Sequence, residues 1–238
     1  MALQALIFDV DGTLADTERD GHRPAFNAAF AEAGLAWQWD VPLYGELLAV
    51  TGGKERMRYY AERHDPAFLA GPDADRRIKE LHAAKTRHYQ AILEAGRIPL
   101  RPGVARLIRE AHASGVRLAV ATTTAPENVT TLLKTALAPD AVDWFEAIGA
   151  GDIVPAKKPA PDIYRWVLER LHLPASACLA IEDSAIGLRA ALAAGLPTLV
   201  STSVYTVGED FSGALAVRAD LADVRLADLE LIHPIKTS

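Results

Sequence analysis

Short apolar runs recur along the chain and alternate with stretches of helical length. The first run, "LQALIFD" at 3–9, stops at an aspartate, and four similar runs follow later. Continuous apolar runs of this length are typical of strands buried on both faces, as in a parallel sheet covered by helices. The expected strands are 3–9, 116–124, 145–152, 178–184 and 197–202. The helices expected between them are 103–114, 126–137, 160–172 and 184–194.

Residues 16–98 interrupt this alternation. The stretch contains no convincing strand, and its apolar residues recur at the spacing of a helix over 24–35, 43–50 and 73–95. We therefore predict a helical insertion placed after the first strand of an α/β core. The core would be discontinuous, formed by 1–15 and 99–238. The fold class expected is a doubly wound, mostly parallel α/β sheet with an inserted α-helical domain.

The composition is that of an ordinary globular protein. Half of the 238 residues are hydrophobic and 24% are charged, which is enough for a core with an insertion. The formal charge of −6 argues against nucleic acid or an anionic membrane surface as a partner. Cys178 is the one cysteine, and we find neither a signal-peptide pattern nor a membrane-length apolar run. We expect a cytoplasmic monomer.

Acidic and other polar residues follow the expected strands. Asp9 and Asp11 straddle the end of the first strand, where residues two apart point the same way. In doubly wound sheets, ligands bind beyond the carboxyl ends of the strands. Folding would therefore gather the polar residues of these strand ends at one edge of the sheet. These residues are Asp9, Asp11, Thr122, Lys158, Glu182 and Asp183.

Several carboxylates at one edge would repel one another unless they took up protons or bound a cation. Oxygen ligands that leave positions for water favour Mg²⁺. A lysine and a hydroxyl beside such a cluster suit phosphoryl transfer, because the charge on the transferring oxygens must be stabilised. One carboxylate can act as the nucleophile and form an aspartyl phosphate, and a second can serve as acid and base.

The ordered motifs resemble those of the haloacid dehalogenase superfamily of phosphatases. They span the expected core and are Asp-x-Asp-Gly-Thr-Leu at 9–14, Thr122, Lys158-Pro159 and Glu182-Asp183. The resemblance implies a Rossmann-like core with the insertion as a helical cap. It also implies Asp9 as nucleophile and Mg²⁺ ligand, and Asp11 as general acid and base that binds Mg²⁺ through its backbone carbonyl. True dehalogenases lack the second aspartate, which argues against dehalogenation.

The remaining motif residues receive their roles from the same resemblance. Thr122 would hydrogen-bond the phosphoryl group. Lys158, the lysine directly before a proline, would pair with this group and with Asp9. Asp183 would complete the Mg²⁺ site, with Glu182 next to it as a further candidate ligand.

Segments of the insertion resemble a narrower group, the CbbY-type sugar phosphatases associated with the Calvin cycle. These segments are 15–30, 39–48 and 51–57. The resemblance implies xylulose 1,5-bisphosphate as the substrate, hydrolysed to xylulose 5-phosphate. The second phosphate of a bisphosphate needs cations, which arginine and lysine residues of the insertion could supply. The candidate substrate-binding residues are Glu18, His22, Arg23, Lys54, Arg58 and Thr123.

Each motif also has a purely structural interpretation. The first motif could form a strand-end turn, and Thr122 could cap the helix that follows. Lys158 could be a solvated surface charge, and Glu182-Asp183 could cap the next helix. These alternatives carry more weight for the insertion, where the candidate residues could be packing or surface side chains.

Two other functions use similar chemistry. A phosphomutase of the same fold, similar to β-phosphoglucomutase, would return the phosphoryl group from Asp9 to a sugar. The interval from Thr17 to His22 is one residue longer than in the familiar mutase motif, which disfavours this function. A receiver-type signalling switch would keep a stable aspartyl phosphate, but receivers lack a long insertion after the first strand. We therefore expect a Mg²⁺-dependent phosphatase acting on a small sugar phosphate.

Overall fold

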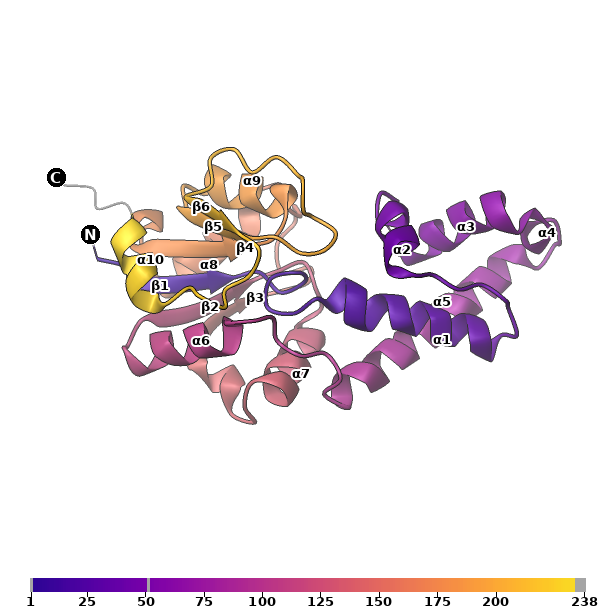
Figure 1. Ribbon diagram of the computed structural model, residues 1–238, viewed down its shortest axis with the longest axis horizontal. Helices are drawn as coiled ribbons and strands as arrows, with labels where there is room; N and C mark the ends of the chain where they lie inside the picture. Colours follow the sequence, from indigo (N-terminus) through magenta and orange to yellow (C-terminus); the bar gives the residue numbers. More distant parts are fainter. Residues whose placement is uncertain (1, 51, 234–238) are drawn as a thin grey trace. The chain divides into compact units, whose positions relative to one another are not determined.

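The α/β part of the chain is built on a six-stranded parallel sheet (Figure 1). The computed structural model describes residues 2–50 and 52–233. The strand order is β3-β2-β1-β4-β5-β6, and each neighbouring pair runs parallel. The strands are β1 (Ala5–Phe8), β2 (Arg117–Ala121), β3 (Phe145–Gly149), β4 (Cys178–Glu182), β5 (Thr198–Ser201) and β6 (Ala216–Arg218). The expected doubly wound α/β fold is confirmed.

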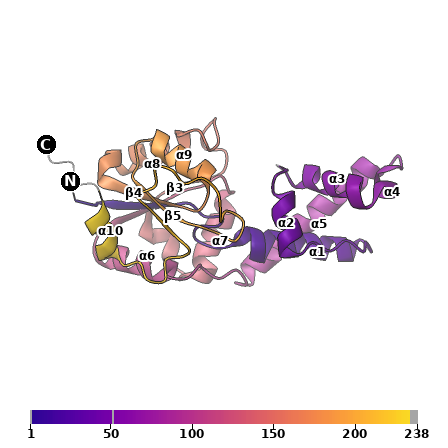
Figure 2. The same ribbon diagram turned by 45° about the horizontal axis from the view of Figure 1, so that its top comes forward.

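Helices cover both faces of this sheet because its central strands are apolar on both sides. They are α6 (Val104–Ala113), α7 (Pro126–Ala136), α8 (Asp162–Leu171) and α9 (Ala185–Ala193). In β1, Ala5 and Ile7 pack into one core with residues of α8 and α9. Leu6 and Phe8 point to the other face and are also fully buried. Figures 1 and 2 show α6 and α7 on the side of the sheet opposite α8 and α9.

The carboxyl ends of the central strands are level with one another. Phe8, the last residue of β1, pairs with Val120 in β2 and with Ile181 in β4. The residues that follow these three positions therefore meet at one edge of the sheet. The strand order also reverses beside β1, and sheets of this type bind ligands at such a point. The sheet therefore brings polar side chains from separate parts of the sequence to one place.

Residues Thr17–Arg97 form a second compact unit, besides the unit formed by Met1–Asp16 and Ile98–Ser238. Its elements are the π-helix η1 (Glu18–His22), α1 (Arg23–Glu32), α2 (Val41–Leu47), α3 (Gly53–His64), α4 (Pro66–Leu69) and α5 (Ala74–Glu94). Its centre is aromatic: the ring of the fully buried Trp39 lies 4.7 Å from that of Phe26 and 4.8 Å from that of Phe30. Among the described residues, none of the helices has the length and apolar character needed to cross a bilayer.

Several elements differ from the expectation. The observed strands are shorter than the expected ones. The strand expected at 116–124, for example, ends at Ala121, and the threonines that follow lie outside the sheet. β6 and α10 (Leu226–Ile232) were not expected. β6 has three residues and none of them is fully buried, so it is an exposed strand at the edge of the sheet. The segment 51–57, which resembles the CbbY-type phosphatases, begins at Thr51, and this residue lies outside the described ones.

Candidate active site

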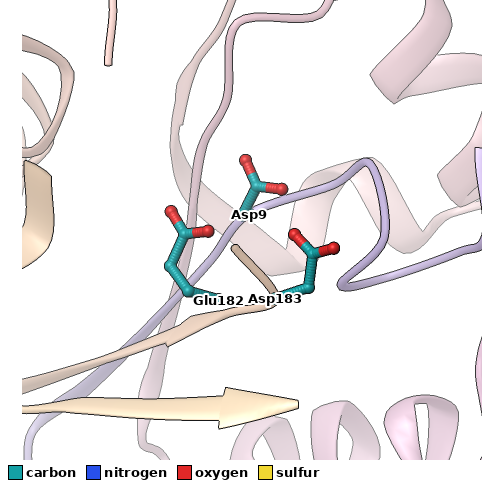
Figure 3. Close-up of side chains that lie close together, drawn as sticks. All are labelled: Asp9, Glu182 and Asp183. Carbon is teal, nitrogen blue, oxygen red and sulfur yellow. The ribbon is translucent and has the colours of Figure 1, made fainter. Parts of the chain in front are cut away.

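Three carboxylates meet at the carboxyl edge of the sheet. Asp9 follows β1 directly, while Glu182 ends β4 and Asp183 comes next. One ligand oxygen from each residue lies within 4.8 Å of the other two, and all three side chains are buried. Figure 3 shows the three carboxylates side by side, with Asp9 coming from the chain after β1. The level strand ends thus bring together acids that are far apart in the sequence.

One ammonium group contacts two of these carboxylates. Lys158 Nζ lies 2.6 Å from Asp9 Oδ1 and 2.6 Å from Glu182 Oε1, and the lysine side chain is 7% exposed. The hydroxyl of Tyr164, on α8, donates a further hydrogen bond to Glu182 Oε1. Glu182 therefore receives two donors on one oxygen. These contacts hold the lysine against Asp9.

The burial of this cluster changes its protonation. Burial raises the pKa of Asp9 to about 7; Lys158 opposes the shift, and Glu182 and Asp11 add to it. Burial, reinforced by Asp9 and Glu182, also raises the pKa of Asp183 well above its usual value. Although burial opposes it, the pKa of Lys158 is raised, because Asp9 and Glu182 stabilise the ammonium. Without a cation, Asp9 and Asp183 therefore tend to hold protons, because three ionised carboxylates would carry more negative charge than one lysine balances.

This arrangement fits a divalent cation. The unbalanced charge of three buried carboxylates is part of the reason why the pKa values of Asp9 and Asp183 are raised. Carboxylate oxygens are the ligands of hard cations, and Mg²⁺ keeps water on its remaining positions. The residues that could hold it are Asp9, Asp183 and Glu182. Of these, Glu182 already accepts hydrogen bonds from Lys158 and Tyr164.

The other core residues expected at the site follow the same strands. Asp11 is half-buried and its charge acts on Asp9, but the group of three close carboxylates does not include it. Thr122 is buried directly after β2, and its hydroxyl accepts a 3.3 Å hydrogen bond from the backbone N–H of Thr124. Thr123 is exposed. The structure thus brings Asp9 together with the lysine and the acids of β4, and leaves Thr123 at the surface.

Glu18 and His22 lie on η1 in the helical unit. Glu18 Oε2 accepts a 2.5 Å hydrogen bond from the hydroxyl of Tyr44, and the Tyr44 oxygen accepts one of 2.9 Å from Arg56 Nη1. His22 Nδ1 lies 2.8 Å from Lys85 Nζ. Both candidate residues therefore have fixed polar neighbours within the helical unit.

The three cationic candidates of the helical unit have different surroundings. Arg23 Nη1 donates a 3.2 Å hydrogen bond to the carbonyl of Trp39. Arg58 forms an ion pair with Asp75 on α5. Lys54 lies in the first turn of α3 and is exposed. Both arginines therefore already have a partner: a phosphate bound by Arg23 would share it with the carbonyl of Trp39, and one bound by Arg58 would share it with Asp75.

Two side chains at the acidic cluster were not singled out in the sequence. Tyr164 contacts Glu182, and Thr206 Oγ1 lies 3.4 Å from Asp183 Oδ2. Tyr164 had one available signal, because a tyrosine on the apolar face of an expected helix needs a partner for its hydroxyl. Thr206 lies in a loop without any strand or helix pattern, so nothing in the sequence distinguishes it.

The fold and the acidic site define a class of enzyme. A family model for haloacid dehalogenase-like hydrolases matches residues 3–195, and the chain belongs to this family. It is a phosphatase, as the sequence motifs predicted. The plasmid CbbY protein of Cupriavidus necator is 54% identical over 221 residues, which cover 93% of this chain and 87% of that protein.

Solved structures extend this similarity to the fold. The crystal structure of CbbY from Rhodobacter sphaeroides in complex with phosphate has a TM-score of 0.78 at 46% identity, covering 96% of this chain and 99% of that chain. A mutant of the same protein, in complex with xylulose 1,5-bisphosphate, gives a TM-score of 0.79 at 46% identity, covering 95% and 99%. The expected relationship to the CbbY-type phosphatases is confirmed.

Proposed function

We propose that the chain is a Mg²⁺-dependent phosphatase that hydrolyses xylulose 1,5-bisphosphate to xylulose 5-phosphate and phosphate through an aspartyl-phosphate intermediate. The observation that carries the proposal is the contact of Lys158 with Asp9 and Glu182, beside Asp183. A buried ammonium next to a candidate cation site provides positive charge where a phosphoryl group bound to Asp9 would lie. The same contacts keep the Asp9 carboxylate in one position.

In this mechanism, an oxygen of Asp9 attacks phosphorus, and the bond from phosphorus to the ester oxygen breaks. Asp11 protonates the leaving oxygen and then takes a proton from the water that attacks the aspartyl phosphate. Phosphate leaves, and Asp9 returns as a carboxylate. Thr122 hydrogen-bonds the phosphoryl group, and Lys158 balances its charge. Bound Mg²⁺, held by Asp9, Asp183 and the Asp11 carbonyl, would neutralise the phosphoryl oxygens.

The choice of substrate rests on the relatives and on the helical unit. The mutant CbbY structure with xylulose 1,5-bisphosphate belongs to a protein 46% identical to this chain. We assign the carboxylate of Glu18 to sugar hydroxyls and the cationic residues to the second phosphate. The proposed substrate-binding residues are Glu18, His22, Arg23, Lys54, Arg58 and Thr123.

The test compares phosphate release from four sugar phosphates in the presence of Mg²⁺. The kcat/KM for xylulose 1,5-bisphosphate should exceed that for fructose 1,6-bisphosphate, ribulose 1,5-bisphosphate and β-glucose 1-phosphate by at least about tenfold. Asp9→Asn should lower turnover by about 10⁴-fold, because the amide is not a nucleophile. Asp143→Asn is the control. It changes an exposed aspartate between α7 and β3 and should leave turnover unchanged.

Each alternative has its own result in these assays. Substantial Mg²⁺-dependent turnover by Asp9→Asn would contradict the covalent mechanism. An isomerised sugar phosphate in place of free phosphate would indicate a phosphomutase, and a stable aspartyl phosphate without turnover would indicate a receiver-type switch. Equal, slow hydrolysis of all four compounds would be consistent with phosphatase activity but would contradict the assignment of xylulose 1,5-bisphosphate as the substrate. We also propose a monomer in the cytoplasm, which light scattering and fractionation would test.

A further inference from the structure

The loop after β5, residues 202–209, includes two buried hydroxyl residues, Ser203 and Thr206; we call it the β5 loop. Ser203 is 6% exposed and Thr206 is 9% exposed, whereas Val204 and Val207 are 46% and 72% exposed. The loop thus turns hydroxyl side chains inward and apolar side chains outward. Burial of apolar surface would favour the opposite arrangement. The buried hydroxyls must therefore have polar partners inside.

The partner is the carboxylate of Asp183. Thr206 Oγ1 lies 3.4 Å from Asp183 Oδ2, and the nearby Ser203 hydroxyl acts to lower the pKa of this carboxyl, against the larger effect of burial. The two hydroxyl oxygens lie 3.0 Å apart, and the Ser203 backbone N–H donates to Thr206 Oγ1 over 2.8 Å. The Thr206 proton has three acceptors within reach: Asp183 Oδ2, Ser203 Oγ and, at 3.5 Å, the Ser203 carbonyl. Of these, the ionised carboxylate is the strongest acceptor.

Contacts at both ends fasten the β5 loop beside the acidic cluster. Glu209 Oε2 accepts a 2.6 Å hydrogen bond from the backbone N–H of Ala185, the first residue of α9. Arg101 donates a 2.6 Å hydrogen bond to the carbonyl of Thr202 and another to the carbonyl of Gly12. One end of the loop is thus tied to the helix after the β4 acids, and the other to the turn after β1.

A second segment, the turn after β1, approaches the same Asp183 oxygen. Gly12 approaches so closely that a Cβ atom there would lie 2.1 Å from Asp183 Oδ2. Both the turn after β1 and the β5 loop therefore lie against this oxygen. Hydrogen bonds that fix one oxygen of a carboxylate also fix the direction of the other.

We propose that Ser203 and Thr206 are positioning residues, which orient Asp183 for the divalent cation and set the cation affinity of the site. The inference deepens the proposed Mg²⁺ dependence and rests on it. A carboxylate that is already oriented loses less conformational freedom when the cation binds. Outer-shell partners of this kind change metal affinity by about 10- to 100-fold.

The test is calorimetric titration of the full chain with Mg²⁺. For Ser203→Ala/Thr206→Val, the dissociation constant of Mg²⁺ should rise about 10- to 100-fold, and turnover should recover at high Mg²⁺. Each single variant should show part of the effect. Thr206→Ser retains the hydroxyl and should keep the affinity of the wild type. Thr202→Val is the matched control, because its hydroxyl contacts the carbonyl of Arg218 instead.

Unfolding in EDTA separates orientation from simple stability. If the variants unfold at lower temperature but bind Mg²⁺ like the wild type, the role of the two hydroxyls is structural and the inference is overturned. Asp183→Asn should abolish Mg²⁺ binding. If it does so while Ser203→Ala/Thr206→Val binds normally, the inference fails and the proposed function stands. If the wild-type chain binds no Mg²⁺, both fail.

Discussion

A single lysine shares its charge between two carboxylates at the centre of the site. Lys158 contacts Asp9 and Glu182, and its ammonium lies 5.0 Å from the centre of the Tyr164 ring. Removing it would leave two buried carboxylates without their neighbouring positive charge. Asp9 and Glu182 could be predicted because each stands at the end of an apolar run, and Lys158 because its position before Pro159 resembles the family motif. Tyr164 gives a weaker signal, since a tyrosine on an apolar helix face needs a partner for its hydroxyl, but the pattern does not identify Glu182 as that partner.

We expect the affinity of the chain for Mg²⁺ to rise with pH up to neutrality. Burial raises the pKa of Asp9 to about 7, so below this pH the metal-free group carries a proton that the cation must displace. One competing proton lowers the apparent association constant by up to about tenfold for each pH unit below the pKa. Titration calorimetry at a series of pH values should show the affinity rising up to about pH 7, and the raised pKa of Asp183, a second ligand, acts in the same direction.

The protonation of Asp9 also predicts how stability depends on pH, in the opposite direction to the Mg²⁺ affinity. In EDTA, Asp9 in the unfolded chain loses its proton near the ordinary aspartate pKa of 3.8, whereas in the folded chain its pKa is about 7. The free energy of unfolding should therefore fall as the pH rises between these values. Asp9→Asn should remove this contribution. An Mg²⁺ affinity that is independent of pH below 7 would contradict the assigned protonation.

At the scale of elements, the register of three strands explains how much of the site could be predicted. β1, β2 and β4 end level with one another, so the polar residues that interrupt their apolar runs meet in space. The β5 loop also reaches this edge, but its contribution depends on Ser203 and Thr206, in a segment without periodicity. Hydrophobic patterns identify buried elements, whereas a loop that is held by hydrogen bonds leaves no such pattern.

Gly12→Ala is expected to damage the turn after β1 and the cation site together. Gly12 has a φ of +86°, and an added Cβ would lie 2.1 Å from Asp183 Oδ2. The left-handed conformation costs a residue with a Cβ about 1–2 kcal/mol, and the clash displaces a carboxylate of the site. A displacement of this kind should lower turnover by about 10²-fold. Chemical unfolding and steady-state kinetics measure the two effects separately.

Gly115→Ala is the matched control in the same α/β unit. Gly115 has a φ of +75°, but no atom lies within 4 Å of its added Cβ. The variant should lose about the same 1–2 kcal/mol of stability and keep normal turnover. Equal turnover in the two variants would show that the approach of Gly12 to Asp183 has no catalytic consequence.

At the scale of the whole molecule, the two units carry different groups of candidate functional residues. The α/β unit holds the grouped acids and Lys158, whereas the helical unit carries Glu18 and the other proposed substrate-binding residues except Thr123. The chain passes between the units twice, after Asp16 and after Arg97. The insertion could be predicted because residues 16–98 break the strand–helix alternation. Its contacts could not, since Tyr44 and Arg56 become neighbours of Glu18 only through folding.

This division predicts that Glu18→Gln changes selectivity and leaves the chemical step intact. Tyr44 fixes one oxygen of Glu18, and Arg56 fixes Tyr44, so the other oxygen can accept a hydrogen bond from a sugar hydroxyl. The amide keeps the shape but loses the charge. The kcat/KM for xylulose 1,5-bisphosphate should fall about 10- to 100-fold, the size expected for a hydrogen bond to a charged group. Hydrolysis of p-nitrophenyl phosphate should remain near that of the wild type.

Glu62→Gln provides the comparison for this variant, because Glu62 is an exposed glutamate of α3 in the same unit. It should leave the kinetics of both substrates unchanged. If Glu18→Gln reduced the hydrolysis of both substrates equally, Glu18 would support the chemistry or the fold, and the division between the units would be wrong. If it affected neither, Glu18 would have no part in binding the sugar. A loss confined to the bisphosphate would assign the selection of the substrate to the helical unit.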